Sequence, residues 1–95
     1  MKTYRIYTEN KRKRFLLRLF SESFPGFTVY KATGFWQGKQ EKTLVFEIIT
    51  NDLSADCKLS KMCKQICGYN SQNEILISVS DCVVMFVGTS GILGE

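Results

Sequence analysis

The chain has 95 residues, with 13 Lys and Arg against 9 Asp and Glu, and it contains no His. Hydrophobic residues make up 44% of the sequence, including seven Phe, four Tyr and one Trp, so a folded core is expected and disorder is excluded. The length fits a single domain. The lack of His excludes a His general base, a Ser-His-Asp or Cys-His pair and any His metal ligand.

The charge is unevenly distributed along the chain. Residues 1–42 hold ten Lys and Arg against three Asp and Glu, a net charge of +7, whereas residues 43–95 carry a net charge of −3. This asymmetry predicts an anionic partner for the first half. No run approaches the ~18 apolar residues of a membrane span, and the N-terminus lacks the apolar segment of a signal peptide. We therefore expect a cytoplasmic protein with no membrane partner.

The first half of the chain predicts a strand, a helix and a hairpin. Residues 3–8 alternate and are rich in β-branched and aromatic types, which is typical of a strand. Residues 11–24 place apolar side chains on one helical face, with Asn10 as the expected cap and Pro25-Gly26 as the stop. Residues 27–36 and 42–50 predict two strands joined by a turn over residues 37–40.

The second half predicts a helix and a strand. Residues 51–54 offer capping side chains, and the apolar positions from Leu59 to Cys67 follow the helical period. Gly68 is the expected left-handed residue at the end of this helix. Residues 74–80 alternate as a fourth strand.

This order of elements is β-α-β-β-α-β, the ferredoxin-like arrangement of an α+β domain, in which both helices cover one face of an antiparallel sheet. Residues 82–87 form an additional apolar run, for which we expect an extra C-terminal strand. It could join the sheet edge through a hairpin at Ser80-Asp81 or pair with another subunit, which would protect an apolar edge. The predicted domain spans residues 1–87, and residues 88–95 are interpreted as a flexible tail.

Two groups of residues are candidates for binding. The first is a cluster of cations at the start of the first helix, where acidic residues would be favoured electrostatically. The cluster, with the free N–H groups of a helix start, could bind phosphate or carboxylate, or it could be a solvated basic face. Its candidate residues are Lys11, Arg12, Arg14 and Arg18.

The second candidate is the tip of the hairpin. Phe35 and Trp36 lie between two glycines, and their flat faces could stack a base or a partner, unless Trp36 folds back onto the sheet. Gln37, Lys39 and Glu41 would supply hydrogen bonds.

Glu47 is the one charged residue in an apolar strand. It requires a partner, for which Lys31 and Arg5 are candidates, or it faces a ligand on the open side of the sheet. Cysteine spacing does not match a zinc site, so we interpret all four cysteines as small core residues and predict no metal and no cofactor. They are Cys57, Cys63, Cys67 and Cys82. Without His, a paired-carboxylate site or a phosphate-binding loop, we expect no enzymatic activity.

The layout, the basic first helix and the hairpin from Gly34 to Gly38 resemble small PII-like proteins. The run from Phe27 to Gly38, with Glu41 following, resembles uncharacterised ferredoxin-like proteins of bacteria and phages. The PII resemblance implies a trimer that binds anionic nucleotides in clefts between subunits, near a loop joining the second and third strands.

Two functional hypotheses follow from these residues. One is a non-catalytic binding protein for an anionic small molecule, a nucleotide or nucleotide-derived signal; in a phage, such a protein would sequester a host immune signal. The alternative is a protein-interaction module or inhibitor that acts through the hairpin tip and the C-terminal strand. We also expect a homo-oligomer, a dimer or a trimer. Nucleic-acid binding is disfavoured, because a net charge of +4 is small.

Overall fold

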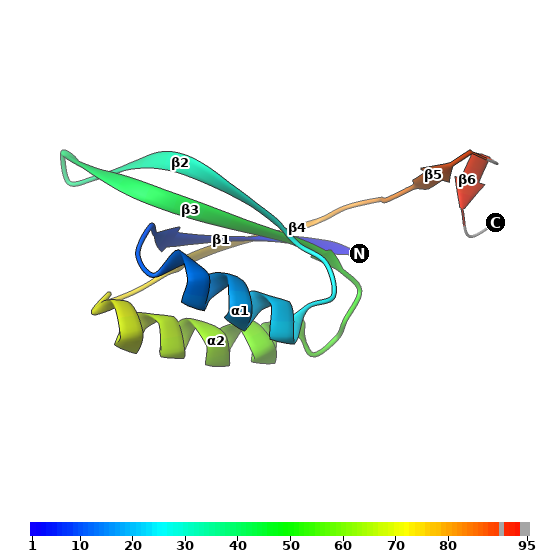
Figure 1. Cartoon of the computed structure of the whole chain (residues 1–95). Helices are drawn as coiled ribbons and strands as arrows, with labels where there is room; N and C mark the ends of the chain where they lie inside the picture. Colours follow the sequence, from blue (N-terminus) through cyan, green and yellow to red (C-terminus); the bar gives the residue numbers. More distant parts are fainter. Residues whose placement is uncertain (90, 94–95) are drawn as a thin grey trace.

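The computed structural model describes residues 1–89 and 91–93. It confirms an α+β chain with two helices and a four-stranded antiparallel sheet of strand order β2-β3-β1-β4. Figure 1 shows both helices on one side of this sheet. The elements are β1 (Lys2–Glu9), α1 (Lys13–Ser23), β2 (Thr28–Trp36), β3 (Lys39–Thr50), α2 (Ala55–Asn70), β4 (Leu76–Asp81), β5 (Phe86–Gly88) and β6 (Gly91–Leu93).

The core lies between the sheet and the helices. Alternate strand residues face the helices, so Ile6 of β1 and Phe46 of β3 are paired in register and fully buried. Phe20 of α1 stacks on Phe46, with ring centroids 4.0 Å apart. The core thus joins α1 directly to the centre of the sheet. Its other buried members include Tyr4, Leu16, Leu44, Ile48, Leu59, Met62 and Ile66.

The opposite face of the sheet carries a mixed surface. Val45 of β3 is nevertheless only 1% exposed, because Tyr7 and Tyr30 lie opposite it on the two neighbouring strands. Glu47 also lies on this face, 3.0 Å from Nε of Arg5, its partner in register. This ion pair raises the pKa of Arg5. The predicted ion pair of Glu47 is therefore present with Arg5, whereas Lys31 lies opposite Leu44, on the side of the helices.

The ends of α1 and α2 differ from the sequence predictions. Asn10 does not cap α1: the N-cap is Arg12, in the left-handed conformation, and it makes no side-chain capping bond. Gly68 does not end α2, which continues to Asn70, and Ser71 is the left-handed residue beyond it. The left-handed residues at these two helix termini are therefore Arg12 and Ser71, whose residue types do not favour this conformation.

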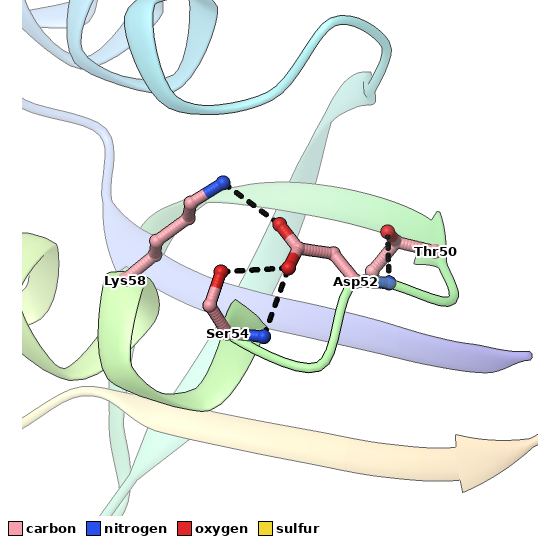
Figure 2. A network of polar contacts seen from close by, with 4 residues as sticks. All are labelled: Thr50, Asp52, Ser54 and Lys58. Atoms are coloured by element: carbon pink, nitrogen blue, oxygen red, sulfur yellow. Dashed lines mark hydrogen bonds and ion pairs between the residues drawn. The ribbon is translucent and has the colours of Figure 1, made fainter.

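Asp52 organises the start of α2 (Figure 2). Its Oδ1 accepts hydrogen bonds from the backbone N–H and the hydroxyl of Ser54, and its Oδ2 lies 2.7 Å from Nζ of Lys58. Thr50 Oγ1 accepts a hydrogen bond from the N–H of Asp52. Lys58 and Ser54 hold the pKa of Asp52 well below its usual range. The predicted capping segment therefore does lie at the start of α2. The side chain that makes the polar contacts there is Asp52, and the N-cap residue Ser54 makes no side-chain capping bond.

The C-terminal segment departs from the sheet. Residues 82–85 continue in the direction of β4, and β5 pairs with β6 away from the domain (Figure 1). The first alternative, a hairpin at Ser80-Asp81, is therefore wrong, because both residues continue the β4 ladder, opposite Thr3 and Lys2 of β1. The extra strand exists, as the short β5, and β6 lies within residues 88–95, where the sequence predicted no element.

Candidate binding site

The β2–β3 hairpin extends beyond the rest of the sheet. The β1–β3 ladder ends at Glu9 opposite Thr43, whereas β2 and β3 remain paired up to Trp36 opposite Lys39. The projecting end exposes 72% of Phe35 and 61% of Trp36. Trp36 does not fold back onto the sheet, so both rings are available to a ligand or a partner.

The hairpin turn is tighter than predicted. Gln37 and Gly38 alone form it, with φ values of 50° and 79°, and Lys39 and Gln40 already belong to β3. Two successive positive φ values are the signature of the type I′ turn, whose twist matches that of the paired strands. Farther from the tip, a Cβ atom at Gly34 would come within 2.8 Å of Thr43 Oγ1, so any larger residue there would force the Thr43 side chain to move.

A hollow of about 670 Å³ lies at the base of this projection, between the hairpin, the end of β1 and the segment from α2 to β4. Its volume is within the range of small-molecule sites. Phe35, Trp36 and Glu41, three of the predicted site residues, line it together. The remaining lining residues are Tyr7, Thr8, Glu9, Ala32, Thr33, Gly34, Thr43, Gln72, Asn73, Glu74, Ile75 and Leu76.

The wall of this hollow carries three glutamates and no Lys or Arg. Two of the predicted cations lie beside it. Nζ of Lys11 is 2.7 Å from the carboxylate of Glu9, which lines the hollow. The guanidinium of Arg12 lies 4.7 Å from the centre of the Tyr69 ring, near the end of α2 and just before the lining residue Gln72.

The structure does not bring the other predicted residues into the hollow. Arg14 and Arg18 are exposed on α1, and Gln37 and Lys39 lie at the turn, outside the lining. Several lining residues were not predicted. Tyr7 and Glu74 come from segments far apart in the sequence, so no local spacing could have connected them. The sequence also did not predict that the ring of Phe15 stacks on that of Tyr69, with ring centroids 4.1 Å apart, or that Arg12 lies over the Tyr69 ring. These residues too are far apart in the sequence.

A second hollow, of about 650 Å³, lies along α2 and β4. Cys63 and Cys67 line it from α2, while Ile77 and Val79 line it from β4. Burial, with a contribution from Cys67, raises the pKa of Cys63 to about 11, so this thiol stays protonated near neutral pH. A protonated thiol is a poor nucleophile.

The cysteines are less buried than predicted. All four are free thiols, but Cys57 is exposed on the outer side of α2, and the other three are only partly buried. The interpretation of Cys57 as a core residue is wrong, because the buried face of α2 is formed by Leu59, Met62 and Ile66. Among the residues described by the structure, no three His, Cys, Asp or Glu side chains gather where they could hold a metal ion.

Comparison with known proteins gives no family. No family model and no curated protein matches the chain. Among solved structures, the chain is similar to the de novo designed protein Foldit4, with a TM-score of 0.47 and 15% identity over 86% of this chain and 96% of that one. None of the helices in the described part of the chain has the length and apolar character needed to cross a membrane.

Proposed function

We propose that the chain is a non-catalytic binding protein for an anionic small molecule of the nucleotide class, which it binds at the hairpin end. The observation that carries this proposal is the hollow that brings Phe35, Trp36 and Glu41 together next to Lys11 and Arg12. Exposed aromatic faces beside a cavity suit a flat heterocycle, and adjacent cations suit its phosphates.

The charges around the hollow orient the proposed ligand. The carboxylates of Glu41 and Glu74 would repel a phosphate inside the hollow, but they accept hydrogen bonds from the N–H groups at the edge of a base. Guanine presents such donors. The base therefore occupies the hollow against Trp36, and the phosphates extend outward to Lys11 and Arg12.

The ferredoxin-like assignment belongs to the same proposal. The β-α-β-β-α-β order and the strand order β2-β3-β1-β4 support it. The PII resemblance has weaker support, because a two-residue turn at Gln37 and Gly38 replaces the loop that such proteins use beside their nucleotide. A phage protein that sequesters a host nucleotide signal remains one form of this proposed function.

Calorimetric titration with GDP and with guanosine tests both halves of the site. Replacement of both Lys11 and Arg12 by Ala should weaken GDP binding at least tenfold, because charge-assisted hydrogen bonds contribute about 1.5–3 kcal/mol each. The same replacement should leave the binding of guanosine, which has no phosphate, unchanged. Trp36→Ala should weaken the binding of both GDP and guanosine. Lys61→Ala, an exposed cation on α2, is the matched control and should change neither.

Native mass spectrometry of protein taken directly from cells extends the test to the natural ligand. A releasable nucleotide-sized mass would support the proposal and begin to identify the ligand. If the protein carries no such mass, and neither GDP nor guanosine binds at millimolar concentration, the proposal is wrong.

A second candidate, the protein-interaction module, is favoured by one specific observation. Residues 82–88, which we call the C-terminal arm, expose 97% of Val83 and 68% of both Met85 and Val87. Large apolar side chains grouped on a projecting segment mark an interaction site.

A further inference from the structure

The C-terminal arm extends beyond the domain as a continuation of β4 (Figure 1). The last backbone hydrogen bond that joins it to the sheet runs from the N–H of Cys82 to the carbonyl of Met1, at 3.0 Å. Beyond this point Val83, Met85, Phe86 and Val87 are exposed, Phe86 by 59%. Among the described residues, the arm therefore pairs only with β6, through residues 86–88, and no part of it beyond Cys82 pairs with the four-stranded sheet.

Among the strands that the structure describes, none pairs with the outer edge of β4. β4 is the last strand of the sheet order, with β1 on one side only. In an antiparallel ladder, alternate residues direct their N–H and C=O to opposite edges. Because Cys82 is bonded to Met1 on the β1 side, the backbone groups of Ile77, Val79 and Asp81 point to the free edge.

The side chains next to this edge form an apolar groove. Ile77 and Val79 lie on the helix side of β4, where they line the hollow of about 650 Å³ against Leu59 and Cys63 of α2. Val79 is 51% exposed. A strand added to this edge would satisfy the backbone groups of β4 and cover the groove.

We infer that two copies of the chain exchange their C-terminal arms, each arm adding an antiparallel strand to the β4 edge of the other copy. The arm is the occupant that the structure favours, because it is apolar, similar in length to β4 and directly continuous with it. The exchange needs only a second copy of the same chain and no different protein. A twofold arrangement forms a closed dimer instead of an open-ended filament. It also protects an edge strand that would otherwise invite aggregation.

We place the twofold axis at Cys82, the last residue of the arm that is bonded to the sheet of its own copy, and this choice sets the register of the exchange. With the two Cys82 residues opposite each other at the axis, Met85 lies opposite Val79 of the second copy, and Val87 lies opposite Ile77. Directly opposite residues share a face of the sheet, so Met85 and Val87 lie over the apolar groove. The register also places the backbone groups of Ile77 and Val79 where the incoming strand can bond to them.

The same register makes a chemical prediction about Cys82. Its backbone groups point to β1, so the two Cys82 residues form a non-hydrogen-bonded pair, with Cα atoms ~4.5 Å apart. This spacing lies within the range of ~4.4–6.8 Å that a disulfide can bridge. The exchange does not use the hairpin hollow, so it stands or fails independently of the proposed ligand.

Light scattering and mild oxidation of the purified chain test the exchange. We expect a mass twice the 10.9 kDa of one chain and, after oxidation, a covalent dimer. Cys82→Ser should abolish the covalent dimer. Cys57→Ser, which removes the exposed cysteine of α2, is the matched control and should leave it intact.

A charge in the interface provides the second measurement. Met85→Asp should raise the dissociation constant of the dimer at least tenfold, while circular dichroism remains unchanged, because Met85 lies outside the core. Leu53→Asp places the same charge at a fully exposed apolar residue before α2 and should have no effect. A monomer at high concentration, a trimer, association only with a different protein, or a covalent dimer that persists in Cys82→Ser would each overturn the inference.

Discussion

Phe20 and Val83 are both large apolar residues, but the fold treats them in opposite ways. Phe20 of α1 is fully buried and stacks on Phe46 of β3, whereas Val83 is 97% exposed on the C-terminal arm. The difference is the presence of a second layer: the sheet lies under α1, and no element of the described domain lies over the arm. Burial therefore depends on what the topology places opposite a side chain, and not on its hydrophobicity alone.

The largest expected effect comes from the buried side of this comparison. Phe20→Ala should lower the free energy of unfolding by about 3–5 kcal/mol, because it removes an aromatic ring from a packed core and leaves a cavity. Urea unfolding followed by circular dichroism measures this loss. A loss below about 1 kcal/mol would contradict the contrast between buried Phe20 and exposed Val83, because it would mean that the Phe20–Phe46 stack does not hold α1 on the sheet.

A smaller effect is expected where the core meets a polar group. The hydroxyl of Tyr4 donates a hydrogen bond of 2.6 Å to Asp56 Oδ1. Tyr4→Phe should lower the free energy of unfolding by about 1 kcal/mol at neutral pH. Urea unfolding of both proteins measures the difference, and Tyr30→Phe, on the open face of the sheet, is the matched control.

The same bond predicts a pH dependence. The hydrogen bond to Asp56, together with burial, raises the pKa of Tyr4 from 10.0 to about 12. The neutral phenol is therefore favoured by folding, and its contribution is fully present below pH 10 and lost as the pH rises through 12. The difference in the free energy of unfolding between the wild type and Tyr4→Phe should therefore decrease between pH 10 and pH 12. A difference that stays constant over this range would show that the raised pKa of Tyr4 does not contribute to stability.

The smallest effect concerns the exposed hairpin. Gln37 occupies a left-handed position, which costs most L residues ~1–2 kcal/mol, and asparagine tolerates this conformation better. Gln37→Asn should raise the free energy of unfolding by about 0.5 kcal/mol, part of that cost. Thermal unfolding measures it. An unchanged stability would indicate that the hairpin end opens before the core unfolds.

The sequence predicted the elements that carry a strong periodic pattern. The helical faces around Phe20 and Leu59 and the alternation around Phe46 indicated the two helices and the central strand, because each pattern has one apolar side. The ends of elements were harder to predict, since Arg12 and Ser71 adopt left-handed conformations that their residue types do not favour. The arm was predicted as a strand, but its separation from the sheet depends on the absence of a turn after Asp81.

The candidate site was only partly visible in the sequence. Phe35, Trp36 and Glu41 are close in the chain, so the hairpin tip could be identified as one unit. Glu74 and Tyr7 reach the same hollow only because β1 and the segment before β4 lie beside the hairpin. The spacing of residues along the chain does not indicate which distant segments come together in the fold. The three glutamates in the wall of the hollow could therefore be recognised only from the structure.

The projection of the hairpin and of the C-terminal arm at opposite ends gives the chain principal extents of 47 × 25 × 24 Å. The radius of gyration is 14.9 Å, whereas a chain of this length packed as a sphere-like domain would have about 12 Å. An elongated particle experiences more friction than a sphere of equal mass. A single copy will therefore diffuse slowly and elute early in gel filtration, with the apparent size of a larger globular protein.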